Sequence, residues 1–354
     1  MPVSCARTSR PEIVVIIIIM VLVPMGAGAG NSTGAATWRV QVDGVTFGPE
    51  GAGRLNLFVT VLDPDDLPVQ GLDRSDFIIM EDGRLHSGPI RLAPLAASGR
   101  GLAYVVLVDQ AEDLATSLTF VRQAAAGFIK EMGFRHEAAV IGYSGAVELA
   151  AGPSADAGRL SRAVLDLPPQ PEKPRLYDGL LKGVDVLRGM RNAQTRPKPA
   201  IILLTEGRDE SSQFSFEAAL SRLLEAEVRL FLVGYGQDES DLAGLMELAR
   251  LSGGQGYFTP DPEALKSILL NVAERLKHQL ILSYDSIRIR TDGATHRIRV
   301  HIRARAGQGE TEIEFVSPDI EKPGRGWFEI FTAALAAALV LIWLRARPGW
   351  RRPG

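Results

Sequence analysis

The sequence predicts an α/β fold: a doubly wound, mostly parallel sheet with helices on both faces, flanked by a β-sandwich-like module and a C-terminal transmembrane helix. Between residues 99 and 276, short apolar segments alternate with amphipathic ones, as buried parallel strands and their covering helices do. On both sides of this region, apolar residues recur at every second position, which is typical of half-buried strands. Near the C-terminus, an apolar run of helical length lies between tryptophans and is followed by arginines, a pattern typical of a membrane anchor.

The first residues have the layout of a signal peptide. Arg7 and Arg10 precede an apolar run at residues 13–25, which is short for a bilayer span, and small residues follow it. We therefore predict a signal peptide at residues 1–29 and export from the cytoplasm; an uncleaved N-terminal anchor is the alternative. The chain has one cysteine, Cys5, so the exported part is not expected to contain disulfides.

Two β-rich segments flank the α/β region. Residues 30–98 include the runs WRVQVDGVTF, RLNLFVTVL and DFIIMEDGRL, in which apolar and polar residues alternate and turn residues separate the runs. The period of two returns in residues 277–320. We predict an N-terminal β module at 30–98 that the strands of 277–320 complete, with the α/β region between them. Two separate β modules are the alternative, although each would be small for an independent core.

The α/β domain, predicted at residues 99–276, alternates strands with helices. Strands are expected at residues 103–109, 138–144, 200–205, 228–235 and 256–258. Helices are expected at residues 116–132, 157–165, 177–190, 216–226, 241–251 and 263–276. Because the strands are almost wholly apolar, both faces of their sheet must be covered.

The C-terminal segment predicts a single membrane anchor. Residues 327–344 are apolar except for Glu329, and Trp327 and Trp343 stand at the edges, where interfacial aromatics lie. The tail at 345–354 contains four arginines, which predicts that it is cytoplasmic. The rest of the chain would then be displayed outside the cytoplasmic membrane, in the periplasm or outside the cell. A buried soluble helix is the alternative.

Composition and motifs favour recognition over catalysis. The sequence GYSGA around Ser144 lacks the final glycine of a Gly-x-Ser-x-Gly elbow, and no base is evident beside it. His296 and His301 would point to opposite faces of a strand, so they are not expected to share a metal. The net charge of −3, without a stretch that interleaves basic and aromatic residues, predicts no nucleic-acid partner.

Acidic residues follow two of the predicted strands. Asp109 ends the first strand and Glu206 follows the third, so both are expected at one crevice beyond the carboxyl ends of the sheet. The runs AYVVLVDQAEDL, PRLYDGLLKGVDVL and AIILLTEGRDESS resemble the three metal-site loops of the von Willebrand factor type A domain. Residues 55–300 as a whole are similar to a bacterial group of secreted proteins that carry this domain. The resemblance implies protein–protein binding, in adhesion, matrix contact or the assembly of an envelope complex.

The resemblance also implies a degenerate metal site. The family holds a divalent cation with an Asp-x-Ser-x-Ser loop, a threonine and a second aspartate. Asp109 keeps the first position, whereas Ala111 and Asp113 replace the serines, Pro174 the threonine and Glu206 the last aspartate. The carboxylates of Asp109, Asp113 and Glu206 could still hold a weakly bound magnesium, calcium or manganese ion. Because three carboxylates would more than neutralise it and weaken its attraction for a partner's acid, we expect recognition without metal.

The expected partner-binding surface is the rim of this crevice. Its residues are Asp109, Gln110, Glu112, Asp113, Arg175, Glu206 and Arg208. Two further acids are expected to serve helix starts: Asp178 the helix at 177–190, and Asp209 the helix at 216–226. We therefore predict a non-catalytic recognition module with a protein partner. The alternatives are a subunit of a membrane assembly, in which Glu329 pairs with another helix, and a cation-dependent adhesin.

Overall fold

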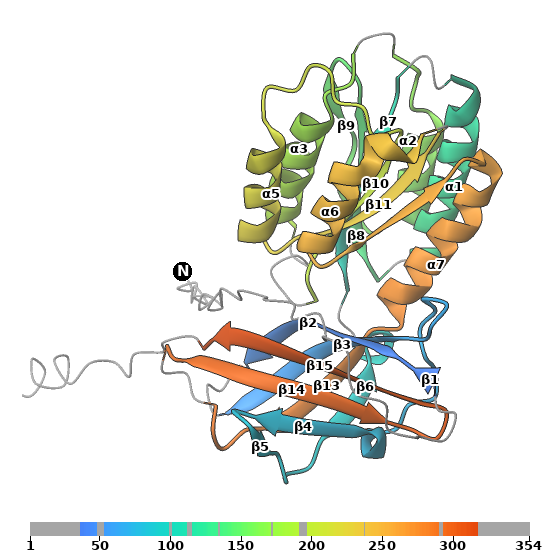
Figure 1. The fold of residues 1–354 in the computed structure, drawn as a ribbon. Coiled ribbons are helices and arrows are strands. Elements are labelled where there is room, and N and C mark those ends of the chain that lie inside the picture. Colours follow the sequence, from blue (N-terminus) through green and yellow to red (C-terminus); the bar gives the residue numbers. More distant parts are fainter. Residues whose placement is uncertain are drawn as a thin grey trace, which may run out of the picture.

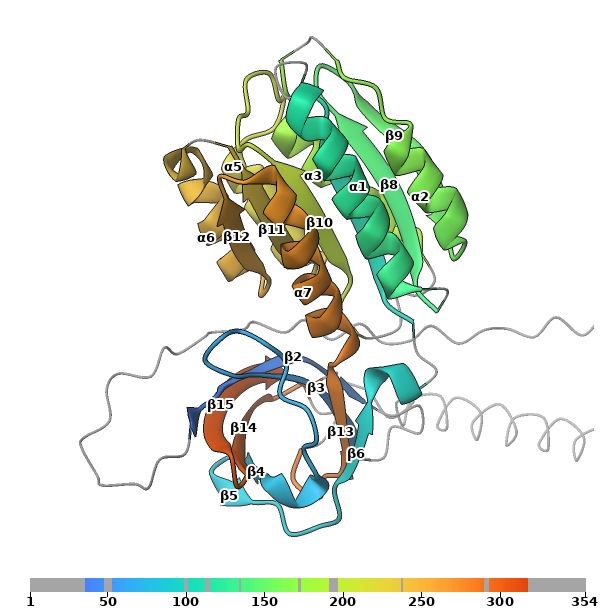
Figure 2. The ribbon, with the colours of Figure 1, turned by 90° about the vertical axis from the view of Figure 1, so that its right-hand side faces the viewer.

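The computed structural model describes residues 36–47, 53–98, 101–111, 115–133, 135–170, 173–190, 197–236, 238–289 and 293–317 (Figures 1 and 2). The predicted signal peptide at 1–29, the predicted membrane helix at 327–344 and the tail at 345–354 lie outside these residues. Among the helices described, none is long and apolar enough to cross a membrane.

The larger domain is built on a six-stranded sheet with the order β12-β11-β10-β7-β8-β9. Its strands are β7 (Ala103–Asp109), β8 (Glu137–Tyr143), β9 (Val147–Ser154), β10 (Ala200–Thr205), β11 (Arg229–Tyr235) and β12 (Gln255–Thr259). Every residue of β7, β10 and β11 is buried, because these strands are covered on both faces.

Of the helices that the structure describes, three pack on each face of this sheet (Figure 1). One face carries α1 (Ala115–Met132), α2 (Ala157–Leu165) and α7 (Leu265–Lys277). The other carries α3 (Leu176–Arg188), α5 (Phe216–Glu225) and α6 (Ala243–Leu251). The α/β fold expected from the sequence, with helices on both faces of a mostly parallel sheet, is therefore present.

The strand β9 was not expected. It pairs antiparallel with β8 at the edge of the sheet, whereas the other neighbouring strands run parallel. Most of its residues are exposed or half-buried, and its sequence VELAAGPS contains glycine and proline. Because an exposed edge strand does not require an apolar run, its sequence carries little strand signal.

The smaller domain contains two β-sheets. One has the order β1-β15-β14-β4-β5 and the other β2-β3-β13-β6, and Figure 2 shows both around a common interior. The early strands are β1 (Ala36–Thr37), β2 (Arg39–Phe47), β3 (Arg54–Leu62), β4 (Phe77–Glu81), β5 (Arg84–Leu85) and β6 (Arg91–Pro94). The late strands are β13 (Leu280–Asp285), β14 (Thr295–Arg303) and β15 (Gly307–Val316).

Early and late strands share both sheets of this β module. β13 lies between β3 and β6, antiparallel to each, and β14 lies between β4 and β15. Apolar side chains that alternate along these strands form one core, with Leu57, Val59, Ile298 and Phe315 among its members. The α/β domain is thus inserted between the halves of a module that neither half could complete alone.

The two domains meet at the amino ends of the central strands, through a network of buried polar groups. Asp43 lies at a bulge of β2, where the register with β3 shifts, and is 3% exposed. Its carboxylate accepts hydrogen bonds from Thr60 Oγ1 and Gln279 Nε2, both at 2.5 Å, and lies 3.3 Å from Nη1 of Arg229. Arg229 is the first residue of β11 and is 4% exposed. Buried charges of opposite sign therefore join the β module to the sheet.

A second arginine crosses the same junction. Arg275, near the end of α7, is buried and donates to the side-chain carbonyls of Gln255 and, at 3.0 Å, Gln41. The amide nitrogen of Gln41 in turn donates to the carbonyl of Gly253 at 2.8 Å. These bonds connect β2 to α7 and to the loop before β12, so the contact does not depend on the chain connections alone.

Candidate functional site

The carboxyl end of the central sheet places Asp109 below the surface. The side chain is 1% exposed at the end of β7. Its Oδ2 accepts hydrogen bonds from Thr205 Oγ1 at 3.0 Å and from the Tyr143 hydroxyl at 3.3 Å, and its Oδ1 accepts from the Ala111 amide at 3.2 Å. Burial raises the pKa of Asp109 to about 6, although these three donors oppose the rise. The carboxylate is therefore held by the protein's own hydroxyl and amide groups.

Tyr143 and Thr205 complete this cluster, and sequence reasoning did not single them out. They are the last residues of β8 and β10, the strands on either side of β7, and Tyr143 is directly opposite Asp109 in the register. The Tyr143 hydroxyl also lies 2.8 Å from Thr205 Oγ1, which accepts from the Gly207 amide at 2.9 Å. Burial and the neighbouring Asp109 carboxylate raise the pKa of Tyr143, so it remains a donor. The sequence could have indicated them only through their positions at the ends of strands that flank β7.

Gln110 is also buried, and it attaches the loop before α3 to the sheet. Its backbone amide donates to the carbonyl of Tyr143 at 2.9 Å and its side-chain amide donates to the carbonyl of Pro168 at 2.6 Å. The Gln170 amide donates to the carbonyl of Gln110 at 2.7 Å, and Ala111 and Gln170 form a parallel bridge. The residue predicted as a partner contact therefore supports the floor of the crevice.

Arg175, the N-cap residue of α3, forms an ion pair with Asp178. Its Nη2 lies 2.6 Å from Oδ2 of Asp178, and its Nε donates to the same oxygen at 2.8 Å. The other oxygen of Asp178 accepts from the amides of Gln213 and Phe214 at 2.9 and 3.1 Å. Asp178 therefore lies in the first turn of its helix, as predicted, but its carboxylate fixes the loop before α5.

The prediction for Asp209 was wrong about the helix that it serves. Its Oδ1 accepts from the Leu176 amide at 2.8 Å and from the Ser212 hydroxyl at 2.5 Å, so it caps α3. The cap of α5 is Ser215, whose hydroxyl accepts from the Ala218 amide. Asp209 is close to α5 in sequence, but the fold brings its loop to the start of α3. Asp178 on α3 thus binds the loop before α5, and Asp209 in that loop binds the start of α3.

Glu206 and Arg208 lie at the rim of the crevice and are partly exposed. Their side chains form an ion pair at 3.4 Å, with 24% and 36% of their surfaces accessible. Gly207 between them has φ +96°, and a Cβ there would lie 2.9 Å from the carbonyl of Asp241, so this turn requires glycine. Glu112 and Asp113, the remaining predicted site residues, lie outside the described residues.

The arrangement does not fit a bound divalent cation. Asp109 already accepts three hydrogen bonds and is almost inaccessible, Ala111 and Pro174 offer no side-chain oxygen, and Glu206 is paired with Arg208. Within the described residues, no group of three or more His, Cys, Asp or Glu side chains is placed to hold a metal. Because magnesium requires near-octahedral oxygen ligands, the site residues that the structure describes do not by themselves supply its cage; Asp113 is not among them.

Comparison with known proteins identifies the larger domain. Residues 105–271 match the family model of the von Willebrand factor type A domain. None of the curated proteins matches this chain.

Several solved structures are similar to this chain. One is a von Willebrand factor type A protein from Catenulispora acidiphila, at 10% identity, with TM-score 0.44 and coverage of 81% of this chain and 75% of that one. Another is an aerotolerance-related membrane protein from Bacteroides fragilis, at 11% identity, TM-score 0.40 and coverage of 49% and 100%. A third is proximal thread matrix protein 1 from the mussel byssus with a zinc-occupied metal motif, at 15% identity, TM-score 0.42 and coverage of 56% and 50%. The chain thus spans about half the length of the mussel protein.

Proposed function

Residues 105–271 are a von Willebrand factor type A domain, and we propose that the protein is a non-catalytic recognition module that binds a protein partner without metal. Domains of this family are protein-interaction modules in general. The observation that supports binding without metal is the environment of Asp109. Its carboxylate is buried and accepts hydrogen bonds from Thr205, Tyr143 and Ala111. A partner's acidic side chain would therefore find no cation at this position.

The proposed contact surface is the part of the crevice rim that solvent reaches. Arg175, Glu206 and Arg208 contribute partly exposed charged groups there, with side-chain accessibilities between 24% and 36%. Asp109 and Gln110 lie beneath them and hold the loops in place. These charged groups favour a partner whose contact surface is polar.

We also propose that this module is displayed outside the cytoplasmic membrane. The support is in the sequence: the signal-peptide layout of residues 1–29, the apolar run at 327–344 and the arginine-rich tail at 345–354. An anchored module would meet partners in the periplasm or on another surface.

Metal dependence is tested by melting curves of the purified protein in millimolar magnesium, calcium or manganese. A ligand that binds only the folded state must raise the midpoint of unfolding. We expect the wild-type midpoint to stay constant, as in Asp109→Ala, which lacks the carboxylate. A rise in the wild type that the variant does not show would mean that the crevice is a cation site.

Recognition is tested by photo-crosslinking from the crevice rim. A photoreactive amino acid at position 208 is expected to capture a partner in cells, in equal yield with and without a chelator. The matched control is position 159, an exposed residue on α2. Capture of the same partner from both positions, or its loss on chelation, would contradict the proposal.

A further inference from the structure

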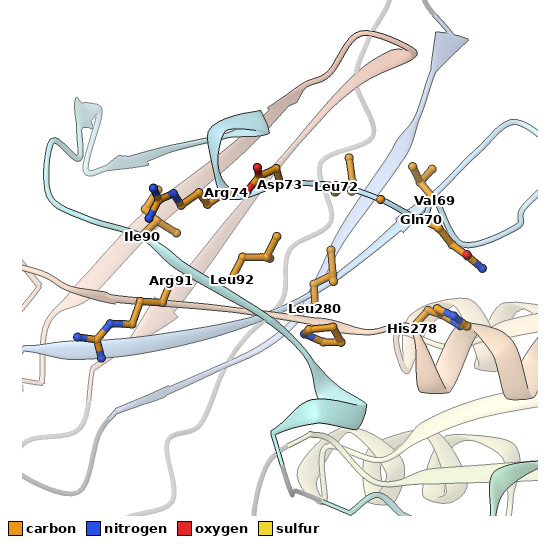
Figure 3. A pocket seen from close by; sticks show the side chains of 12 residues that line it. Val69, Gln70, Leu72, Asp73, Arg74, Ile90, Arg91, Leu92, His278 and Leu280 are labelled. Atoms are coloured by element: carbon orange, nitrogen blue, oxygen red, sulfur yellow. The ribbon is translucent and has the colours of Figure 1, made fainter.

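A groove of about 680 Å³ lies on the β module, away from the crevice (Figure 3). One wall is the loop of residues 69–74, and the other is formed by β6 and the start of β13. Five apolar side chains in its lining are partly buried and pack against the β core. They are Val69, Leu72, Ile90, Leu92 and Leu280. This surface, called the β6 groove below, offers apolar contacts beside a sheet edge.

The strand β6 has a free edge along this groove. It is the last strand of its sheet and, among the described residues, pairs only with β13. The Leu95 amide donates to Gln279 O at 2.8 Å, so residues of the same parity, Arg91 and Ala93, direct their backbone groups at β13. The N–H and C=O groups of Ile90 and Leu92 therefore point away from β13. Within the described part of the chain, no hydrogen bond satisfies these groups.

The side chains beside this edge differ in charge from one face to the other. In Figure 3, Leu92 and Leu280 point toward the loop of residues 69–74, whereas Arg91 points away from it and Arg74 lies beside Ile90. Both arginines are exposed, and neither forms an ion pair with another described residue. A segment lying along β6 would meet an apolar face on one side and positive charge on the other.

We propose that the β6 groove binds an extended segment of a partner protein, which adds to the free edge of β6 as a further strand. Its backbone would pair with the outward N–H and C=O groups of Ile90 and Leu92. Its side chains would alternate, apolar ones packing against Leu92 and Leu280 and acidic ones lying beside Arg91. The ladder would end at Pro94, which has no N–H to donate. This site is separate from the crevice and does not rest on the function proposed there.

A protective role is the competing explanation for the same residues. Charged residues and prolines on short edge strands prevent association with other strands, and Arg91 and Pro94 fit that role. The protective role predicts that no extended peptide binds at this edge. The apolar groove and the unused backbone groups favour binding, so the two explanations give opposite results in one experiment.

The experiment selects a displayed library of random decapeptides against the purified full chain. We expect enriched peptides in which apolar and acidic residues alternate, with dissociation constants on the order of micromolar. On binding, the Leu92 amide should become protected from hydrogen exchange, because it gains an acceptor. Selection of no peptide, or of peptides that protect the crevice instead of Leu92, overturns the proposal.

Two controls separate strand addition from other binding. Methylating alternate backbone nitrogens of the best peptide should abolish binding, since it removes donors without changing the protein. Arg91→Glu should weaken binding of the acidic peptide about tenfold or more and favour its lysine counterpart. The same charge reversal at Arg159, exposed on α2, should leave the affinities for the acidic peptide and for its lysine counterpart unchanged. Binding that survives both methylation and Arg91→Glu overturns the proposal.

Discussion

The two ends of the central sheet bury charge in opposite ways. At the carboxyl end, Asp109 is buried among hydroxyl and amide donors, and no other described residue forms an ion pair with it. At the amino end, Asp43 is buried against the guanidinium of Arg229. Burial raises the pKa of Asp109 to about 6. The ion pair of Asp43 and Arg229 instead connects a strand of the β module to a strand of the central sheet. The sheet thus has one end that responds to pH and one that fixes the domains together.

The difference lies in the partners that each buried carboxyl group has. Burial raises the pKa of Asp109 to about 6, and the hydrogen bonds from Thr205, Tyr143 and Ala111 offset part of that rise. The buried ion pair of Asp43 and Arg229 lies instead at the junction with the β module.

Removing the acid from the amino-end ion pair should have the largest effect. Asp43→Asn leaves the buried guanidinium of Arg229 without its counter-charge, so the free energy of unfolding should fall by about 3–5 kcal/mol. Denaturant titration measures this loss, and the two domains should still unfold together. If Asp43→Asn costs less than about 1 kcal/mol, the network is not a charge-dependent link.

At the carboxyl end, the effect should depend on pH. The pKa of Asp109 is raised from 3.8 to about 6 by folding. Between these values the folded state keeps a proton that the unfolded state has lost, so the stabilisation is complete below about pH 4 and is lost as the pH rises through about 6. Asp109→Asn does not titrate. Relative to this variant, the wild type should lose about 2–3 kcal/mol of unfolding free energy between pH 4 and pH 7. A difference that stays constant across this range would contradict the raised pKa.

The sequence predicted the apolar interior of this fold better than its polar contacts. The strands β7, β10 and β11 are continuous apolar runs whose burial on both faces is visible in composition. The ion pair of Asp43 and Arg229 joins residues far apart in the chain. Moreover, Asp43 lies at a bulge, where the alternation of faces along a strand no longer holds. No pattern in the sequence could therefore have placed the two side by side.

Only part of the candidate site was predicted, because its polar contacts also join residues far apart in the chain. Asp109 stood out because it ends an apolar strand, and the resemblance to a known family supplied the positions of Ala111, Pro174 and Glu206. Tyr143 and Thr205 have ordinary side chains for strand ends, so their convergence on Asp109 required the strand order. The reversal of Asp209 from α5 to α3 likewise depends on how two loops pack.

A smaller effect is expected from removing one of the hydrogen-bond donors to Asp109. Tyr143→Phe removes one donor to Asp109 but leaves those of Thr205 and Ala111, so it should cost about 1 kcal/mol. Because the Tyr143 hydroxyl lowers the pKa of Asp109, its loss should move the pH transition upward. The matched control is Tyr104→Phe in β7, an equally buried tyrosine, which should leave the transition in place. Equal shifts in both variants would mean that the hydroxyl has no specific role.

The smallest effect is expected for an ion pair of the same chemistry in solvent. Arg54 and Asp285 contact each other at 2.8 Å across β3 and β13, but about half or more of each side chain is exposed. Arg54→Gln should therefore change the free energy of unfolding by less than about 1 kcal/mol, because water already solvates both charges. Denaturant titration alongside Asp43→Asn makes the comparison, and added salt should reduce only the Arg54 effect. If both substitutions cost the same, burial is not what gives the amino-end pair its strength.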